Sequence, residues 1–309
     1  MAAQAARRAP SDGAALALRG YAYDCLGQMP QAIADYQRAL ARDPDDERTL
    51  ASLAYLYQEQ GQLARALRDN LALKAPERVR FRDVQVAREL ELLGFSQLAA
   101  QQHARNFQLY PDNVFANIAW PRSLLAAGDA TAARQALALA QQRGTPHPQL
   151  WRLQGELALL EGDRAGASAA FAQAYRLRPQ QSLGQTLALL HGLAPPEASA
   201  IEQRLQDVRR QGADGWSDAA LEQALLLQAQ GHMGPACDAL QRAVDAGFRD
   251  AAWLQATPLF GALRATPGWP LLLARIEADV SAQRAQVLAA RWRPAELQAL
   301  HPPPAAGSR

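Results

Sequence analysis

The sequence predicts an all-α protein made of stacked helical hairpins. Six glycines are each followed by an alanine five positions later, and the first five glycines recur about every 34 residues. Apolar residues spaced by three and four flank these glycines, as on one face of a helix. A glycine turn with this period is the signature of a solenoid of helical hairpins. The glycines are Gly27, Gly61, Gly94, Gly128, Gly162 and Gly231.

The first repeat, residues 13–44, shows the pattern most completely. One face of its first helix carries apolar or small residues, Gly27 marks the turn, and the second helix repeats the face. Pro44 ends the unit, because proline cannot continue a helix and disfavours helical geometry at the residue before it. The residues of the two faces are Leu16, Gly20, Tyr23, Ala32, Tyr36 and Ala39.

Each repeat has one position for a small residue in its first helix and one for a large residue in its second helix. Two helices of a hairpin approach closely only where a small side chain faces the partner helix, and large side chains fill the wedge between hairpins. We expect Pro121, at a small position, to kink or shorten its helix. The small positions are Gly20, Ala54, Ala87, Pro121 and Gly155. The large positions are Tyr36, Asn70, His103, Leu137 and Phe171.

These residue types and spacings resemble the tetratricopeptide repeat, a family of helix–turn–helix units of about 34 residues. The resemblance implies a right-handed α–α superhelix of about seven hairpins with a C-terminal capping helix. Five repeats are expected over residues 13–179, and degenerate sixth and seventh repeats over 180–250. In the sixth repeat, Pro195 and Pro196 stand where the turn glycine is missing and still indicate a turn. Helices are expected near 182–193 and 197–210, followed by a loop at 211–215.

The C-terminal part differs in composition. Residues 251–293 are rich in aromatic residues and are expected to form a helical cap, because terminal repeats need a polar outer cover. Residues from about Ala236 to Gln286 resemble the end of tetratricopeptide regions in bacterial signalling proteins, namely membrane-anchored winged-helix regulators and adenylate cyclases. Residues 1–12 and the proline-rich tail 294–309 are expected to be flexible and disordered, respectively. The apolar stripe expected to cover the last repeat is Trp269, Leu273, Ile276, Val280 and Val287.

Charge and hydropathy narrow the function classes. The net charge is +2, from 32 basic and 30 acidic residues. This balance gives no reason to expect a nucleic acid as partner. No apolar stretch approaches the roughly 20 residues that span a bilayer, and no signal peptide is recognisable at the N-terminus. We therefore expect a cytoplasmic protein that does not insert into membranes, or a periplasmic one if the chain is a fragment. Cys25 and Cys237 are expected to be reduced packing residues.

No catalytic, cofactor-binding or metal-binding motif is found. The five histidines are not at ligand spacing with cysteine or carboxylates, and His103 is interpreted as a packing residue. The acidic run 43–47 is interpreted as a helix N-cap rather than a cation site. The basic cluster from Arg275 to Arg293 is interpreted as a solvated helix face, because acidic residues interrupt it. We therefore predict no catalytic residue, no cofactor and no metal.

The candidate site is the concave face. In tetratricopeptide proteins the first helices line the inside of the superhelix, so the resemblance implies that a partner contacts their inner residues. Tyrosine, phenylalanine and arginine are frequent there, and these types are common in binding hot spots. The alternative is that these side chains have no binding role, since some side chains must lie on the concave face of any solenoid. The candidate partner-binding residues are Tyr21, Arg48, Tyr55, Gln58, Phe81, Arg88, Phe115, Arg122, Arg152 and Glu156.

Two functions of different classes follow. The first is a non-catalytic protein–protein interaction scaffold that binds a peptide or helix of a partner in the concave face. The second is a regulatory or sensor region that acts with a separate output domain of a bacterial signalling system. An enzyme is disfavoured because no paired acid–base or nucleophile constellation is present. The oligomeric state is left open.

Overall fold

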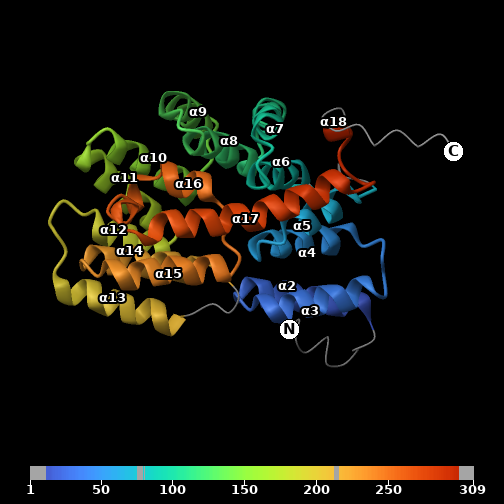
Figure 1. Ribbon diagram of the computed structural model, residues 1–309, viewed down its shortest axis with the longest axis horizontal. Helices are drawn as coiled ribbons and strands as arrows, with labels where there is room; N and C mark the ends of the chain where they lie inside the picture. The colour runs from blue at the N-terminus through green and yellow to red at the C-terminus, as the bar shows by residue number, and fades with distance from the viewer. Residues whose placement is uncertain (1–11, 75–78, 80, 212–215, 299–309) are drawn as a thin grey trace. The chain divides into compact units, whose positions relative to one another are not determined.

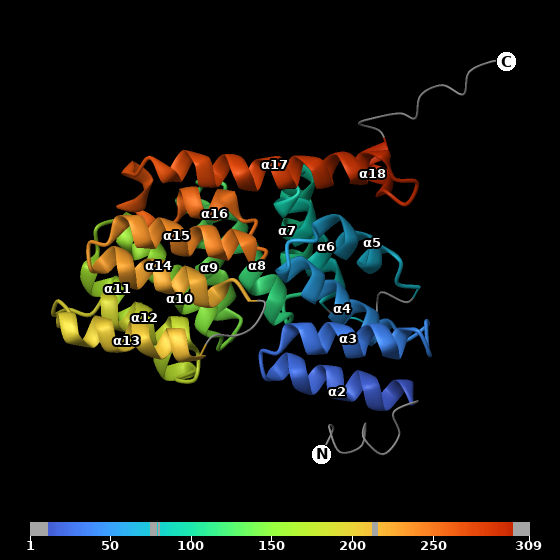
Figure 2. The ribbon, with the colours of Figure 1, turned by 60° about the horizontal axis from the view of Figure 1, so that its bottom comes forward.

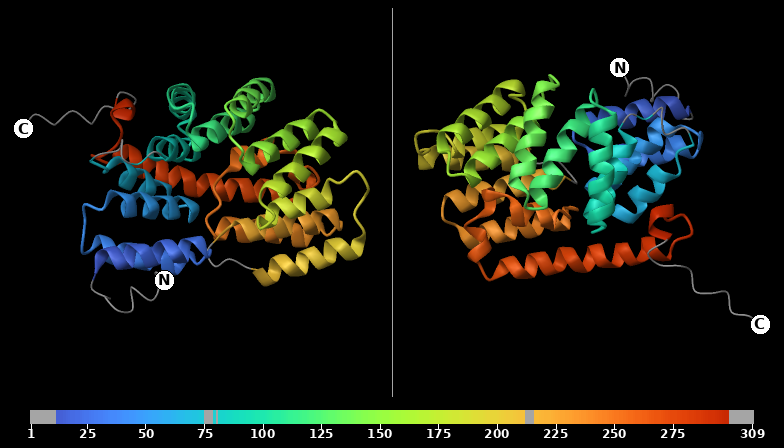
Figure 3. Two further views of the ribbon diagram at one scale, coloured as in Figure 1. Left: turned by 180° about the vertical axis from the view of Figure 1, so that it is seen from behind. Right: turned by 90° about the horizontal axis from the view of Figure 1, so that it is seen from above.

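A computed structural model describes residues 12–74, 79, 81–211 and 216–298, and these residues form helices and connecting loops without a strand (Figure 3). Residues 1–11 of the expected flexible segment 1–12, loop residues 212–215 and tail residues 299–309 lie outside the described residues. The predicted all-α class, with stacked helical hairpins, is confirmed.

The chain forms two compact units. The first comprises residues 1–102 with 277–309, and the second comprises residues 103–276. The boundaries between the units fall within the helices α7 (Ser96–Leu109) and α17 (Gly268–Ala289). We describe each unit by itself.

The first unit contains two complete hairpins and the start of a third (Figure 1). In the first hairpin α2 packs on α3, in the second α4 packs on α5, and α6 leads through Gly94 into α7. Their bounds are α2 Gly13–Cys25, α3 Met29–Leu40, α4 Glu47–Glu59, α5 Leu63–Leu71 and α6 Arg82–Leu92.

The second unit contains four further hairpins, of which α14/α15 is seen side by side in Figure 2. Shorter elements follow them. The hairpins are α8 Val114–Ala126 with α9 Ala130–Gln142, α10 Pro148–Leu160 with α11 Arg164–Leu177, α12 Ser182–Leu190 with α13 Ala198–Gln211, and α14 Asp218–Ala229 with α15 Met233–Asp245. The short elements are α16 Ala251–Ala256, η2 Pro258–Phe260 and η3 Leu263–Ala265.

The hairpin turns follow from the glycines. All six glycines of the periodic pattern have positive φ, for example 72° at Gly27 and 78° at Gly231. This left-handed conformation is one that glycine adopts without the steric strain of a Cβ atom. The predicted turns are therefore confirmed.

The small and large positions meet as expected. A Cβ atom added to Gly20 would lie 2.8 Å from Cδ1 of Tyr36, and one added to Gly155 would lie 2.5 Å from Cε1 of Phe171. Pro121 is buried at the equivalent position, but α8 still runs through it from Val114 to Ala126. The expected shortening of α8 does not occur, because proline removes a single hydrogen bond and the rest of the helix packs normally.

A polar pair replaces the expected apolar packing in the second hairpin. The Asn70 amide donates a 2.6 Å hydrogen bond from Nδ2 to Oε1 of Glu89, and both side chains are buried. Burial raises the pKa of the Glu89 carboxyl well above its usual range, and the negative charge of Asp69 adds to this. The Asn70 hydrogen bond and the Arg82 charge act in the opposite direction but are weaker than the burial.

We expect Glu89→Gln to stabilise the first unit at neutral pH. Because the folded-state pKa of Glu89 is raised, the stability it contributes is full below the unfolded pKa and is lost as the pH rises through the folded pKa. Glutamine keeps an acceptor for Asn70 without a charge. The melting temperature of the variant at pH 7.5 should be higher by about 2–4 °C, with no difference near pH 4. An equal gain at both pH values would contradict this account of Glu89.

The helix α17 contacts more than the last repeat. Its first part buries Trp269, Leu272 and Ile276 in the second unit. In the first unit, Gln283 donates from Nε2 to the Gly61 carbonyl at 2.7 Å and accepts from the Ala64 amide at 3.1 Å. These bonds satisfy backbone groups where α4 ends and α5 begins.

The predicted stripe on α17 is therefore divided between the two units. Val280 and Val287 are buried in the first unit, and Leu272 rather than Leu273 is fully buried in the second. At about 1.5 Å per residue, a helix of 22 residues is much longer than one hairpin helix of 13 residues. A helix of that length extends beyond the single hairpin that the stripe was expected to cover.

Two smaller expectations need correction. Part of the expected disordered tail is helical, since α18 (Ala295–Gln298) buries Leu297. Cys25 is exposed rather than packed, whereas Cys237 lies 3.2 Å from the Thr266 hydroxyl. Both cysteines are free.

Candidate functional site

Six of the predicted partner-binding residues lie in the first unit, on or at the start of the first helices of its hairpins. Tyr21 on α2 is 59% exposed, and Arg48 on α4 is exposed. The other four are half-buried: Tyr55 and Gln58 on α4, Phe81 at the N-cap of α6, and Arg88 on α6.

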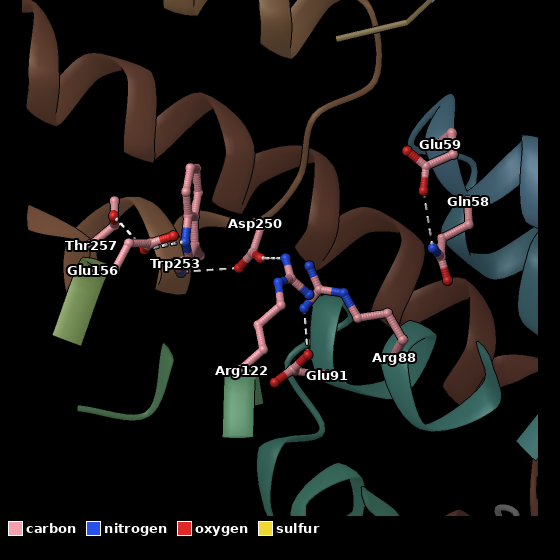
Figure 4. Close-up of polar contacts among 9 residues, drawn as sticks. All are labelled: Gln58, Glu59, Arg88, Glu91, Arg122, Glu156, Asp250, Trp253 and Thr257. Atoms are coloured by element: carbon pink, nitrogen blue, oxygen red, sulfur yellow. Dashed lines mark hydrogen bonds and ion pairs between the residues drawn. The ribbon is translucent and has the colours of Figure 1, made fainter. Parts of the chain in front are cut away.

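The accessible side of α4 is the best-defined part of this surface. Arg48 and Tyr55 are seven residues apart and so share one face of the helix. Leu53 and Ala54 are buried on the packed side. Gln58 donates a 3.3 Å hydrogen bond to the neighbouring Glu59 (Figure 4). The face therefore presents an exposed cation and a half-buried aromatic ring, whereas the Gln58 amide oxygen is buried.

Phe81 and Arg88 are engaged within the first unit. Phe81 packs against the apolar cluster of Ala51, Leu73 and Val79. The Arg88 guanidinium forms an ion pair with Glu91, three residues later on α6 (Figure 4). These residues support the shape of the surface as well as contributing to it.

The second unit holds the other four residues. Phe115 at the start of α8 is exposed, and Arg152 on α10 is half-buried. Arg122 on α8 forms a 2.5 Å ion pair with Asp250, the N-cap residue of α16. Glu156 on α10 is only 4% exposed.

Glu156 is bound by the chain's own α16 segment. Its Oε2 accepts hydrogen bonds from Nε1 of Trp253 at 3.1 Å and from the Thr257 hydroxyl at 2.7 Å (Figure 4). Burial raises the pKa of Glu156, although these two donors and the positive charges of Arg152 and Arg122 act to lower it. The predicted inner residues Arg122 and Glu156 thus bind an internal segment in this structure.

Sequence reasoning missed the residues on the other side of these contacts. Trp253 and Thr257 were treated as part of a general cap, and Asp250 as the last residue of the seventh repeat. The spacing of three and four residues between them places them on one helix face, which is the one signal that could have singled them out.

Other candidate sites have structural explanations. Asp46 is the N-cap of α4 and accepts from the Thr49 amide at 3.2 Å, as the capping interpretation predicted. Arg275 pairs with Asp245, and Arg284 pairs with Glu277, so these basic residues are neutralised locally. Among the described residues, His, Cys, Asp and Glu side chains form no group of three that could hold a metal ion. No helix of the described part is long and apolar enough to cross a membrane.

Family comparison decides the class of repeat. Two models of the tetratricopeptide repeat match residues 13–46 and 35–68. Residues 13–68 of this chain therefore consist of tetratricopeptide repeats. Proteins of this family are typically non-catalytic scaffolds, and the repeats support a general role in protein–protein interaction. The resemblance of the C-terminal part to signalling proteins stays a prediction.

Solved structures similar to this chain are also found. The chain is similar to one in the crystal structure of the APC/C hetero-tetramer Cut9–Hcn1, with a TM-score of 0.52 and 13% identity over 88% of this chain. This chain spans 55% of that one. It is also similar to PilF of Pseudomonas aeruginosa, with a TM-score of 0.43 and 20% identity, covering 58% of this chain and 82% of that one. A tetratricopeptide repeat protein from Parabacteroides merdae gives a TM-score of 0.44 and 12% identity, with 85% and 98% covered. No curated protein matches the chain.

Proposed function

We propose that this protein is a non-catalytic scaffold whose first unit binds a peptide or helix of a partner protein along α2, α4 and α6. The observation that carries the proposal is the accessible face of α4, where Arg48 and Tyr55 lie on one side and the packing residues lie on the other. Exposed Tyr21 extends the surface onto α2.

The chemistry of this surface suits a protein segment. Tyrosine supplies a large rigid contact with a hydroxyl at its tip, and arginine supplies several donors for carboxylates and backbone carbonyls. Both types are enriched where truncation to alanine weakens a protein interface most.

The proposal predicts that Arg48→Ala with Tyr55→Ala weakens partner capture without unfolding the chain. Both side chains are at least partly accessible on α4, so their removal leaves the buried face intact. The proteins retained by the immobilised full chain from a lysate of its source cells would be quantified by mass spectrometry. We expect the specifically retained set to fall about tenfold, equivalent to about 1.4 kcal/mol of binding free energy.

A matched control removes the same side-chain types elsewhere. Arg38 on α3 and Tyr110 at the end of α7 are exposed and lie outside the first helices. Arg38→Ala with Tyr110→Ala should retain the full set. If the control pair and the α4 pair reduced capture equally, the accessible face of α4 would not be the binding surface.

A further inference from the structure

The segment Asp250–Thr257 docks in the second unit as a ligand helix docks in a groove. Its four inward residues are Asp250, Trp253, Leu254 and Thr257, which occupy positions i, i+3, i+4 and i+7. This is the anchor spacing by which an amphipathic helix binds a groove on another protein. The receiving surface is formed by first helices, since α16 packs on α8 and the following η2 packs on α10 and α14.

Each anchor has a defined partner. Asp250 binds Arg122 of α8, and Trp253 and Thr257 both donate to Glu156 of α10. Leu254 is fully buried. The Trp253 ring also meets the edge of Phe260, with ring centroids 5.9 Å apart. Charge, hydrogen bonding and apolar burial thus all contribute to recognition.

The segment Asp250–Thr257 has features of a ligand that can dissociate from the surface it packs on. With six residues, α16 is far shorter than a helix that is stable by itself, so its helical form depends on the docked contacts. Arg122 keeps 33% of its side chain exposed, which leaves one edge of the contact open to water. Release would return the buried Glu156 carboxylate to solvent, and this hydration offsets part of the lost contact energy.

We propose that the inner face of the second unit is a recognition site for a short amphipathic helix, and that Asp250–Thr257 is its resident, exchangeable occupant. The ligand class has an acidic N-cap residue for Arg122, an indole and a hydroxyl for Glu156, and a leucine between them. A partner helix with these anchors reaches the site only after the resident segment leaves. The second unit is therefore autoinhibited, whether or not the first unit binds a partner.

The test uses a synthetic peptide with the sequence of residues 248–261, blocked at both ends and labelled with a fluorophore. Its binding is measured by fluorescence anisotropy to two full-length proteins, the wild type and Trp253→Ala with Thr257→Val, which weakens the resident segment. We expect the variant to bind the peptide at least about tenfold more tightly, because the intramolecular competitor is weaker. Adding Arg122→Ala to the variant should remove most of this gain.

One peptide control and one protein control define the site. The same peptide with Asp250→Ala should bind the opened variant more weakly, because it lacks the partner of Arg122. Adding Arg48→Ala with Tyr55→Ala to the opened variant should leave its peptide binding unchanged. This result would separate the site in the second unit from the surface of the first unit. Equal binding by the wild type and the opened variant, or binding by neither, would overturn the proposal.

Amide hydrogen exchange on the wild type tests directly whether the segment Asp250–Thr257 leaves its site, and it needs no variant. The Leu254 and Thr257 amides donate to the carbonyls of Asp250 and Trp253. We expect them to exchange through local opening, about a hundredfold faster than the core amides of α10 and with little dependence on denaturant. Protection and denaturant dependence equal to those of α10 would show a permanent part of the core and would overturn the proposal.

Discussion

Gly155→Leu is expected to lower the free energy of unfolding of the second unit by about 1–3 kcal/mol or more. A Cβ at this position would already lie 2.5 Å from the ring of Phe171, which is completely buried and has no free space to move into. The larger side chain must therefore push α10 and α11 apart. Gly20→Leu should act in the same way on α2 and α3, because its Cβ would lie 2.8 Å from Tyr36.

Urea denaturation followed by circular dichroism measures this effect. Gly234→Ala is the matched control, since Gly234 lies in the first turn of α15 and an added Cβ meets nothing within 4 Å. The control is expected to be neutral or stabilising by up to about 1 kcal/mol. Unchanged midpoints for both leucine variants would show that the helices do not meet at these glycines.

Arg204→Met is expected to destabilise the second unit by about 3–5 kcal/mol. Arg204 on α13 and Glu222 on α14 form a buried ion pair at 2.7 Å, with the two side chains 4% and 2% exposed. Arg204 also donates from Nε to the Thr186 hydroxyl at 2.9 Å and from Nη2 to the Ser182 carbonyl at 3.0 Å. Arg204 also donates to the Ser182 hydroxyl. Its removal leaves a buried carboxylate without its cation and these three acceptors of α12 without their donor.

A second variant separates the ion pair from the packing. Arg204→Met with Glu222→Leu removes both charges, so it should recover most of the lost stability. Arg210→Met breaks the exposed pair with Asp207 and is expected to change stability by less than about 1 kcal/mol. The three variants are compared by thermal and urea unfolding at pH 7. Similar losses for Arg204→Met and Arg210→Met would contradict a buried role for Arg204.

Most of the fold could be predicted from local sequence patterns. The turn glycines could be predicted because a left-handed residue is required once in each hairpin. The contact of Gly155 with Phe171 followed from repeat register, since the equivalent residues Gly20 and Tyr36 meet in the first hairpin. In the sixth hairpin, Pro195 and Pro196 marked a turn without the glycine, and helices α12 and α13 flank that turn.

The polar core and the C-terminal contacts could not be predicted in the same way. Glu89 lies on α6 at a position that reads as a solvated acidic residue, and its burial depends on Asn70 from the preceding hairpin. Gln283 binds the turn at Gly61 through contacts between residues more than 200 positions apart. Repeat register relates neighbouring hairpins and contains no information on such distant pairs.

The candidate site was predicted only in part. The accessible residues of α4 follow from helical spacing, because the buried face of a repeat fixes the opposite face. In the second unit the same rule selected Arg122 and Glu156 but not what binds them. Asp250, Trp253 and Thr257 come from a segment outside the repeat pattern, so their pairing required the folded chain.

Site-specific photo-crosslinking at Tyr55 tests the proposed scaffold function most directly. A benzophenone amino acid in place of Tyr55 would be activated in the full chain within its source cells, with the same residue at Tyr110 as the control. The proposed function predicts a covalent adduct between position 55 and a segment of another protein, and none of that adduct from position 110. Adducts that are identical at the two positions, or absent at position 55, would contradict it.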